Sequence, residues 1–472
     1  MKNKFINSIT ELKSNFWLIN ILQMFERISY AALVLQMAVY IAQKDLVGGL
    51  QWSHTTKGTI FFFWAIVQNL TPVFLGGLAD KFGRKKIILI SAIFVNLGYF
   101  LLGTQREFTA FLIGTILLGF GLGLYKPAIQ GWIAKSIENA NSSLAWGINV
   151  MLINFAVFFS PSIASFLQEI SWTALFWGCG AIFSINLIAL LFIKDKYQNS
   201  KPENSSIFIK ELFIKLLEKK LIFIVFIMSG FTMIYMQFYE TLPNFIMDWI
   251  DTSTIVTALN LPKFMTFSSN NQILLDFKYI YALNSAIIVL FVVILSYYMS
   301  KINPIRGLII GLLIASFGLF FSGVSNNGFI LIFGVIFYTF GELITNPRFN
   351  EYMSKLGGEY HKSMYLGFMN ISFAIGLAGG SLLGGCLYHN YGEKSGFAIK
   401  YLNEVLNVNE KISHSNAMEI LMQKTGFNFQ QATELLWNYY NPFMFWFFFL
   451  AIGLLSSILL YLYNKKYNID NN

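Results

Sequence analysis

Gly76–Lys86 reads Gly-Gly-Leu-Ala-Asp-Lys-Phe-Gly-Arg-Lys-Lys and lies between two long apolar runs. Its glycines allow a tight turn and a close approach of the flanking segments, and Asp80 can cap the next helix or pair with the basic residues beside it. Short basic loops are typical of the cytoplasmic side of a membrane protein, where lysine and arginine set the orientation. An ordinary loop of that type explains the basic residues but not the spacing of Gly-x-Leu-Ala-Asp.

The composition is that of a polytopic membrane protein. Of the 472 residues, 56% are hydrophobic, 17% aromatic and 12% charged, which does not fit a soluble globule of ordinary surface composition. The net charge of +9 would suit a nucleic-acid partner, but the basic residues cluster in short loops between apolar runs and we predict no such partner. Both cysteines lie in apolar segments, so we predict neither a disulfide framework nor a metal site. All four histidines lie in predicted loops or at helix ends, which argues against a histidine proton relay in the membrane. We also predict no enzymatic activity.

At about 20 apolar residues per span, the chain predicts an all-α fold of about twelve transmembrane helices. An even number places both termini on one side of the membrane, and the basic loops identify that side as cytoplasmic. The first apolar run carries a charged pair and no cleavage site, so we expect it to stay attached as the first helix. The expected location is the plasma membrane, which in a bacterium is the inner membrane.

A shift of 220 residues superposes glycines, prolines and basic residues of the two parts of the chain. The superposed pairs are Lys81 with Lys301, Lys86 with Arg306, Gly98 with Gly318, Gly103 with Gly323, Gly121 with Gly341, Pro127 with Pro347 and Gly147 with Gly367. Glycine is common in membrane helices, but one ungapped register is expected of two parallel six-helix halves with a substrate site between them. We predict an N-terminal bundle over 1–193, a cytoplasmic linker with an interfacial amphipathic helix over 194–220, and a C-terminal bundle over 221–472.

A polar insertion over 388–440 interrupts the second half and is expected outside the membrane on the extracytoplasmic face. Asn416–Gly426 ends in a glycine stop, and Asn428 can cap the next periodic run, so the sequence predicts a short helical hairpin. Its role stays open among a lid, a passive spacer and a surface for a protein partner.

Glu26 and Arg27 lie inside the first apolar run. A charge at the centre of a membrane helix costs about 2.5–3.5 kcal/mol on insertion scales, so each normally faces a partner or a watery cavity that serves transport. Adjacent residues point about 100° apart around a helix, and we therefore expect different partners for the two charges, not mutual neutralisation.

Four more polar residues interrupt apolar runs: Lys126, Glu240, Asn284 and Glu342. The 220-residue offset places Lys126 and Glu342 on equivalent helices, about one turn or ~5.4 Å apart in depth, and the alternative to a functional role is a structural ion pair. Pro127 and Pro347 follow these charges. Each proline frees backbone carbonyls, and it either permits the bending that a rocking transporter uses or forms a static kink.

These stretches resemble known signatures. Gly76–Lys86 resembles the loop signature of the major facilitator superfamily, so Asp80, Gly83 and Arg84 are expected to serve conformational change together with the two prolines. Gly121–Pro127 and Gly341–Pro347 look like the helix 4 and helix 10 signatures of the proton-dependent oligopeptide transporter family, and Gln23–Tyr30 looks like its helix 1 motif.

The resemblance implies roles for particular residues. Arg27 and Lys126 would face the carboxylate of a peptide, and Asn284 and Glu342 its amino terminus. The implied substrate-binding residues are Arg27, Tyr30, Lys126, Asn284 and Glu342, and the implied proton-coupling residues are Glu26 and Glu240.

Three positions depart from the family pattern. Gln23, Ala31 and Val34 stand where the family has a glutamate, a tyrosine and an arginine, and that missing arginine is the family's partner of the helix 7 glutamate. We therefore expect weak proton coupling that runs mainly through Glu240, with Glu26 second.

The resulting expectation is a secondary transporter that imports di- and tripeptides by alternating access, coupled to protons and without a cofactor. Its partners would be a small peptide and the lipid bilayer. Two alternatives stay open: the same fold carrying another organic anion or a drug, and a membrane receptor or assembly component that binds without transport.

Overall fold

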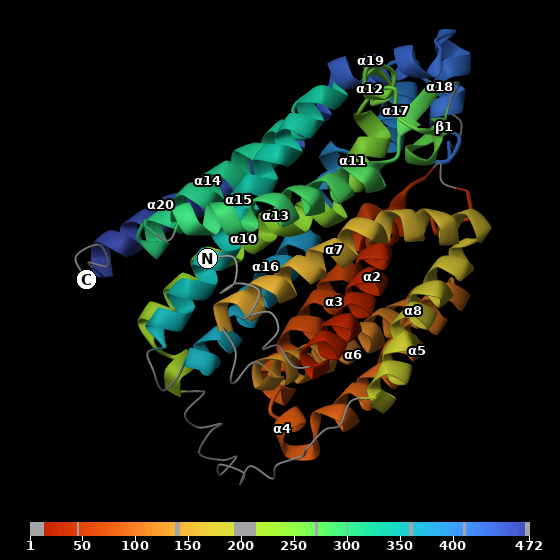
Figure 1. The fold of residues 1–472 in the computed structure, drawn as a ribbon. Helices are drawn as coiled ribbons and strands as arrows, with labels where there is room; N and C mark the ends of the chain where they lie inside the picture. Colours follow the sequence, from red (N-terminus) through yellow and green to blue (C-terminus); the bar gives the residue numbers. More distant parts are fainter. Residues whose placement is uncertain are drawn as a thin grey trace.

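The computed structural model describes residues 14–44, 47–136, 142–192, 214–269, 272–299, 301–357, 362–408 and 412–467. Within these ranges, eleven helices are long and apolar enough to cross a membrane, and Phe277–Val292 is a shorter apolar stretch at the start of a further helix. Figure 1 shows the long helices side by side, with short elements gathered at one end. The predicted α-helical polytopic membrane fold is confirmed.

The helices before residue 193, which we call half 1, are α2 (Ser14–Ala42), α3 (His54–Leu75), α4 (Leu78–Phe82), α5 (Arg84–Thr104), α6 (Phe108–Ser136), α7 (Ser142–Ile170) and α8 (Trp172–Phe192). The long helices after residue 213, which we call half 2 together with α11, are α10 (Lys219–Glu240), α11 (Leu242–Trp249), α13 (Phe277–Met299), α14 (Pro304–Phe321), α15 (Gly328–Leu356), α16 (Lys362–Tyr391) and α20 (Phe445–Tyr467). Most of the predicted linker, 194–213, lies outside the described residues, so its amphipathic helix and the domain boundaries there stay predictions.

The 220-residue offset recurs in the helices themselves. α5 and α14 begin at residues 84 and 304, α6 and α15 at 108 and 328, and α7 and α16 at 142 and 362. Equivalent glycines make equivalent contacts: a methyl group at Gly121 would collide with the backbone of α5 at Val95, and one at Gly341 with the backbone of α14 at Ala315. These positions lack a side chain because two helices meet there closely, once in each half.

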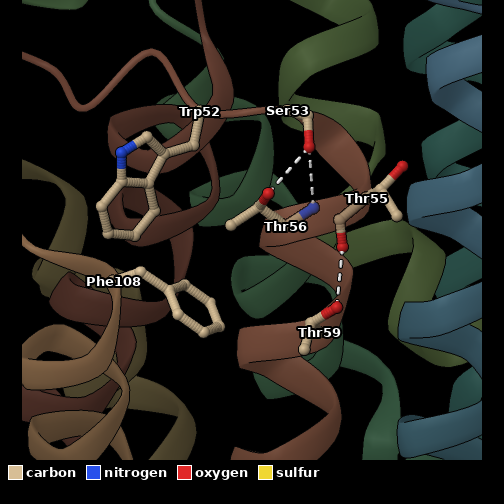
Figure 2. A pocket seen from close by; sticks show the side chains of 6 residues that line it. All are labelled: Trp52, Ser53, Thr55, Thr56, Thr59 and Phe108. Atoms are coloured by element: carbon tan, nitrogen blue, oxygen red, sulfur yellow. Dashed lines mark hydrogen bonds between the residues drawn. The ribbon is translucent and has the colours of Figure 1, made fainter.

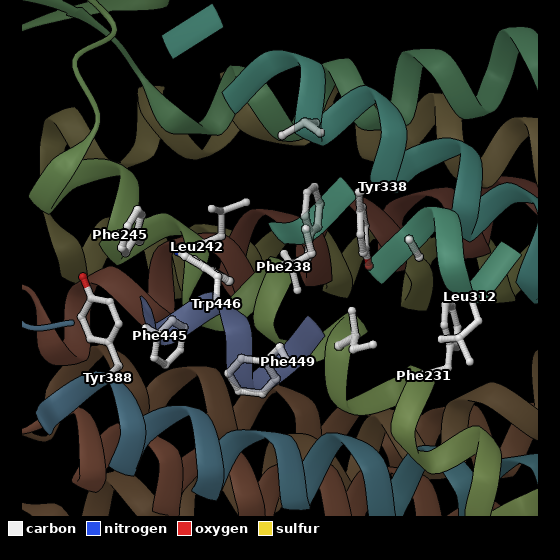
Figure 3. Close-up of a cluster of buried hydrophobic side chains, with 14 of the residues drawn as sticks. Phe231, Phe238, Leu242, Phe245, Leu312, Tyr338, Tyr388, Phe445, Trp446 and Phe449 are labelled. Carbon is white, nitrogen blue, oxygen red and sulfur yellow. The ribbon is translucent and has the colours of Figure 1, made fainter. Parts of the chain in front are cut away.

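Buried apolar side chains form two clusters. One is drawn from half 1 plus Met236, and the other from half 2 and the short elements inserted between its helices, plus Leu35 and Val39. Figure 3 shows the second cluster, in which aromatic rings from α10, α11, α15, α16 and α20 pack together. The Phe238 and Tyr338 rings stack with their centroids 4.2 Å apart. Each half thus has its own packed interior, and a few apolar residues, Leu35, Val39 and Met236, cross from one half to the other.

The signature loop forms the short helix α4 and the turn into α5. Asp80 lies within α4, and Gly83 joins the two helices with a φ of 94° and a ψ of 133°, a conformation that side chains with a Cβ rarely adopt. Arg84 lies against α6, because a methyl group placed on Gly131 would come within 3.1 Å of the Arg84 Nε. The turn therefore depends on Gly83, and Arg84 ties it to the neighbouring helix.

The short elements at the opposite end form what we call the cap. They are α12 (Ser253–Leu259), the 3₁₀ helix η1 (Lys263–Met265), strands β1 (Thr266–Ser269) and β2 (Gln272–Leu275), α17 (Lys394–Glu404), α18 (Ala417–Thr425) and α19 (Phe429–Tyr440); the 3₁₀ helix η2 (Pro442–Met444) then leads into α20. The strands pair antiparallel, with Thr266 opposite Leu275, and are a small exception to the helical fold that the sequence did not predict.

The predicted helical hairpin in the insertion is confirmed. α18 ends at Gly426, which has a left-handed φ of 73°, and Asn428 begins α19 with a capping box shared with Gln431. α17 adds a third helix that the sequence did not predict. The Trp249 indole at the end of α11 donates to the Gly392 carbonyl oxygen over 2.7 Å, so the insertion is anchored to the bundle.

Candidate functional site

Glu26 and Arg27, in the middle of α2, bind each other. The Arg27 Nε lies 2.5 Å from the Glu26 Oε2, and its Nη2 lies 2.6 Å from the Oε1. Our expectation of separate partners is wrong, because both side chains are long enough to converge although their Cα–Cβ bonds diverge. The Glu26 side chain is 2% exposed and that of Arg27 is 26% exposed, so the pair presents mainly its cationic edge.

Tyr30 and Lys126 lie beside this pair. The Arg27 guanidinium carbon is 5.1 Å from the centroid of the Tyr30 ring, a distance at which a cation is attracted to the ring face. Lys126, on α6, is half-buried and lies within electrostatic range of Arg27 and Glu26. Two cations and one carboxylate therefore share this part of half 1, leaving an excess of positive charge.

The acidic part of the site belongs to half 2. The amide nitrogen of Asn284, on α13, donates to Thr339 over 2.9 Å and to the Glu342 Oε2 over 3.3 Å, which joins α13 to α15. Glu342 is buried, and no lysine or arginine of the described segments lies within 4.0 Å of it. The alternative of an ion pair between Lys126 and Glu342 is therefore not what the structure contains.

Tyr235 and Tyr239, on α10, lie between the basic and acidic parts. Their rings are 4.9 Å apart. Tyr235 is within electrostatic range of Glu342 on one side and of Arg27 and Tyr30 on the other. We call these groups the bipolar site. It consists of Glu26, Arg27, Tyr30 and Lys126 in half 1 and of Tyr235, Tyr239, Asn284 and Glu342 in half 2, and it crosses the junction between the halves.

Glu240 is the last residue of α10 and is not part of the bipolar site. It has a cationic neighbour that the sequence did not predict. Lys57 of α3 is fully buried and its Nζ donates to the Glu240 carbonyl oxygen over 2.9 Å and to the Asn244 Oδ1 over 3.0 Å. The nearby Ser381 hydroxyl donates to Leu377, and no described group donates to the Glu240 carboxylate within hydrogen-bond distance. The family's arginine partner of this glutamate is missing, with Val34 in its place, and Lys57 of α3 brings a different cation near Glu240.

More hydrogen bonds join the halves around Lys57. Gln43, after α2, donates to the Asp248 carboxylate over 2.9 Å and accepts from Asn244 over 3.1 Å, and Tyr388 of α16 donates to the same Asp248 over 2.7 Å. α3 and α16 meet where Gly58 faces Gly385. The halves are thus fastened together at the cap end by buried polar groups.

Glu393, between α16 and α17, fastens the cap in turn. Its carboxylate, 2% exposed, lies 2.7 Å from the His389 Nδ1 and 3.1 Å from the His414 Nδ1, and accepts from the Ser395 hydroxyl over 3.0 Å. Lys44 of half 1 lies 3.9 Å away. Burial lowers the pKa of the Lys44 ammonium, and the carboxylates of Glu393 and Asp248 oppose that change. A cavity of about 170 Å³ lies beneath these groups, between the cap and the joined halves.

A second recess, shown in Figure 2, lies at the start of α3. Trp52 and Phe108 form one wall, and the hydroxyls of Ser53, Thr55, Thr56 and Thr59 form the other. The Ser53 hydroxyl already accepts from the Thr56 backbone as the cap of α3. None of these six residues carries a charge, so this recess is separate from the bipolar site.

Pro127 and Pro347 occupy the same position in two helices of equal length. α6 and α15 each contain 29 residues, and each proline is the twentieth of its helix. Both helices continue through their proline. The flexibility of these positions stays a prediction.

The fold is that of a multi-pass membrane protein with charged residues in its interior. The sequence profile described as Major Facilitator Superfamily matches residues 17–381, so the chain belongs to that superfamily.

Curated relatives match a part of the chain. Quinolone resistance protein NorA of Staphylococcus aureus is 26% identical over 146 residues, which is 31% of this chain and 36% of NorA. Multidrug resistance protein 2 of Bacillus subtilis is 26% identical over 167 residues, 34% of this chain and 42% of that protein. The chain thus spans between a third and a half of the length of these relatives.

Solved structures match nearly the whole chain. A peptide transporter POT in complex with sulfate has a TM-score of 0.65 at 14% identity, covering 94% of this chain and 95% of that one. A POT family transporter with a thioalcohol conjugated peptide gives 0.63 at 15% identity, with 92% and 99% covered. The nucleoside transporter NupG gives 0.61 at 13% identity, with 93% and 99% covered. The expected resemblance to oligopeptide transporters is confirmed at the level of the fold.

Proposed function

We propose that the protein imports short peptides by alternating access. The observation that carries this proposal is the bipolar site, with Arg27 and Lys126 in half 1 and Glu342 in half 2. A dipeptide is a zwitterion, so it offers one charged end to each half. Cargo that bridges the halves in this way stabilises a closed arrangement between the two open ones.

Each end of the cargo would be held by charge-assisted hydrogen bonds, which are about twice as strong as neutral ones. Lys126 would donate to the carboxylate, with Arg27 contributing through its exposed edge. Glu342 would accept from the amine, with Asn284 fixing the orientation of the Glu342 carboxylate. Tyr30, Tyr235 and Tyr239 would line the space between the two ends.

We infer that proton coupling runs through Glu240 and its neighbour Lys57. A charged Glu240 attracts Lys57, whose ammonium already holds the Glu240 carbonyl oxygen and Asn244 across the halves. A proton on Glu240 removes that attraction and weakens the junction at the cap end. Glu26, whose two carboxylate oxygens both accept from Arg27, is the second candidate.

The proposed orientation places the basic loop of α4 and both termini in the cytoplasm and the cap outside, in a bacterial inner membrane. The distribution of lysine and arginine supports it, because basic loops stay on the cytoplasmic side. The polar junction around Lys57 would then be an outer gate.

Counterflow into liposomes tests the proposal. Vesicles loaded with unlabelled dialanine should accumulate labelled dialanine, and an inward proton gradient should add uphill uptake. Transport of dialanine amide and of acetylated dialanine, each lacking one charge, should fall by at least tenfold. Equal transport of all three peptides would contradict recognition by the two charged ends.

The second candidate is a carrier of another organic anion or a drug. It is favoured by the sequence similarity to NorA and Multidrug resistance protein 2. In that case dialanine would not compete with the true cargo, and inside-out vesicles would accumulate a drug such as a quinolone. A receptor or assembly component would bind a ligand and show no counterflow.

A further inference from the structure

We propose that Asn370 is a specificity-determining residue: it holds the Lys126 ammonium when no cargo is bound, and a cargo carboxylate takes its place. This inference deepens the proposed function and rests on it. It assigns a role to a residue of α16 that no sequence signature marks.

The geometry around Asn370 is that of an aimed acceptor. The Lys126 Nζ donates to the Asn370 Oδ1 over 3.2 Å, from α6 in half 1 to α16 in half 2. The Asn370 Nδ2 donates to the Gly367 carbonyl oxygen of its own helix over 3.1 Å. Because the amide nitrogen is anchored in this way, the amide oxygen points away from α16 and toward Lys126.

The charge on Lys126 is left uncompensated by this contact. Within the described residues, Asn370 provides its one hydrogen bond, and no carboxylate lies within 4.0 Å of its ammonium. Arg27, which is nearby, repels it, and Glu26, which is itself bound by Arg27, attracts it. A neutral amide is a weaker acceptor than a carboxylate. The carboxylate of an incoming cargo molecule would therefore replace Asn370 as the acceptor of the Lys126 ammonium.

There is room for such a carboxylate. Asn370 and Lys126 are both half-buried. At Gly367, one turn before Asn370, a Cβ would have no atom within 4 Å. Open space therefore lies beside Gly367, whose carbonyl oxygen accepts from the Asn370 amide.

The replacement of Asn370 by cargo would also couple cargo binding to the contacts between the two halves. The bond between Lys126 and Asn370 joins the two halves, and α16 continues from Asn370 to Gly385, which packs on α3, and to Tyr388, which binds Asp248. Replacing Asn370 by cargo removes one tie between α6 and the helix that closes the cap end.

The test compares Asn370→Leu and Asn370→Asp with the unchanged protein. Leucine removes the competing acceptor, so dialanine should bind roughly 2- to 10-fold more tightly. Aspartate places a carboxylate permanently beside Lys126, so dialanine should bind about 10- to 150-fold more weakly. Dialanine amide, which lacks the carboxylate, should show neither change.

The matched controls are Asn350→Leu and Asn350→Asp, at an exposed asparagine that donates only to its own helix. Elution as a single folded species qualifies each purified protein, and calorimetry in detergent measures binding. Loss of dialanine affinity in both Asn370 variants alike, or equal affinity in all three proteins, would overturn the proposal.

Succinate, a carboxylate without an amine, separates this inference from the proposed function. If no peptide binds but succinate follows the order leucine, asparagine, aspartate, Asn370 has the assigned role and the cargo is another anion. If neither dialanine nor succinate binds the unchanged protein, the proposal for Asn370 is wrong. If dialanine is transported but the order is absent, the transport function holds and Asn370 is structural.

Discussion

The Lys57 ammonium lies 2.9 Å from the carbonyl oxygen of Glu240, at the point where α10 ends and α11 begins. Both side chains are completely buried. Pro243, at the start of α11, cannot supply a backbone N–H, which interrupts the helical hydrogen bonds at this break. A lysine of half 1 therefore reaches a helix break of half 2 beside a buried carboxyl group.

This relationship makes Glu240 and Lys57 the first pair to change. Glu240→Gln should abolish uphill uptake of dialanine under a proton gradient while sparing exchange of peptide for peptide, because the amide cannot take up a proton. Uptake and counterflow in the same liposome preparation measure the two activities. Equal uptake with and without the gradient in the unchanged protein would make it a facilitator.

Stability tests the same pair independently of cargo. Lys57→Met removes the cation near the buried Glu240 and both hydrogen bonds of that ammonium, to the Glu240 carbonyl oxygen and to Asn244. Leaving a buried acceptor unsatisfied costs about 1–3 kcal/mol, so the variant should be less stable. The double variant Lys57→Met with Glu240→Gln should recover the part of the lost thermal stability that comes from a buried charge left alone, but not the part that comes from the two lost hydrogen bonds. Losses that simply add in the double variant would show that the two residues do not interact.

Lys126→Ala is the cleanest test of cargo recognition. It removes a half-buried ammonium whose one hydrogen-bond partner among the described residues is a neutral amide, so binding of dialanine should weaken by about 10- to 150-fold with little loss of stability. Arg27→Ala alone is less clean because it strands the buried Glu26, and it should be combined with Glu26→Gln. Unchanged dialanine affinity in both folded variants would remove these cations from the site.

The repeated architecture could be predicted because it depends on local pattern. Apolar length sets the spans, and Gly121 and Gly341 mark close helix contacts that any side chain would block. Because the two halves repeat at an offset of 220 residues, α14, α15 and α16 of half 2 begin 220 residues after their counterparts in half 1.

The partners of the charges could not be predicted. Lys57 stands in the first turns of α3 after polar residues that read as a loop, although Ser53 is a typical helix cap. Asn370 has no charge and no motif to single it out. Whether Glu26 binds Arg27 depends on side-chain reach, which helical periodicity alone does not determine.

Membrane orientation is tested at the two ends of the bundle. In a background with Cys386→Ser, a cysteine replacing Lys424 of α18 should react with an impermeant maleimide in intact cells, and one replacing Lys86 of α5 should react only after lysis. Lys424 is an exposed helical position, whereas Asn407 in the same insertion has a positive φ of 52° that a cysteine would strain. The reverse pattern of labelling would invert the proposed topology.

Glu393 should hold the cap in place. Glu393→Gln replaces a charged acceptor of three groups by an amide, and hydrogen bonds to charged groups contribute about 1.5–3 kcal/mol each. We expect a lower thermal unfolding midpoint and faster protease cleavage within the insertion. Glu419→Gln, an exposed carboxylate of α18, is the matched control and should stay within about 0.5 kcal/mol of the unchanged protein. Equal midpoints for both variants would show that the carboxylate of Glu393 does not fasten the cap.

The signature loop allows a comparison between two glycines six residues apart. Gly83 has a φ of 94°, and holding a residue with a Cβ in such a sparsely populated region costs on the order of 1–3 kcal/mol. Gly77 has an ordinary φ of −68° and no atom within 4 Å of the position of a Cβ, so alanine fits there and restricts the unfolded chain. Gly83→Ala should therefore lower the unfolding midpoint in detergent, whereas Gly77→Ala should leave it unchanged or raise it slightly. Because Gly83 sets the angle between α4 and α5, its variant should also slow counterflow of dialanine at saturating peptide. Equal midpoints and equal rates for the two variants would mean that the turn at Gly83 contributes neither to stability nor to the conformational change.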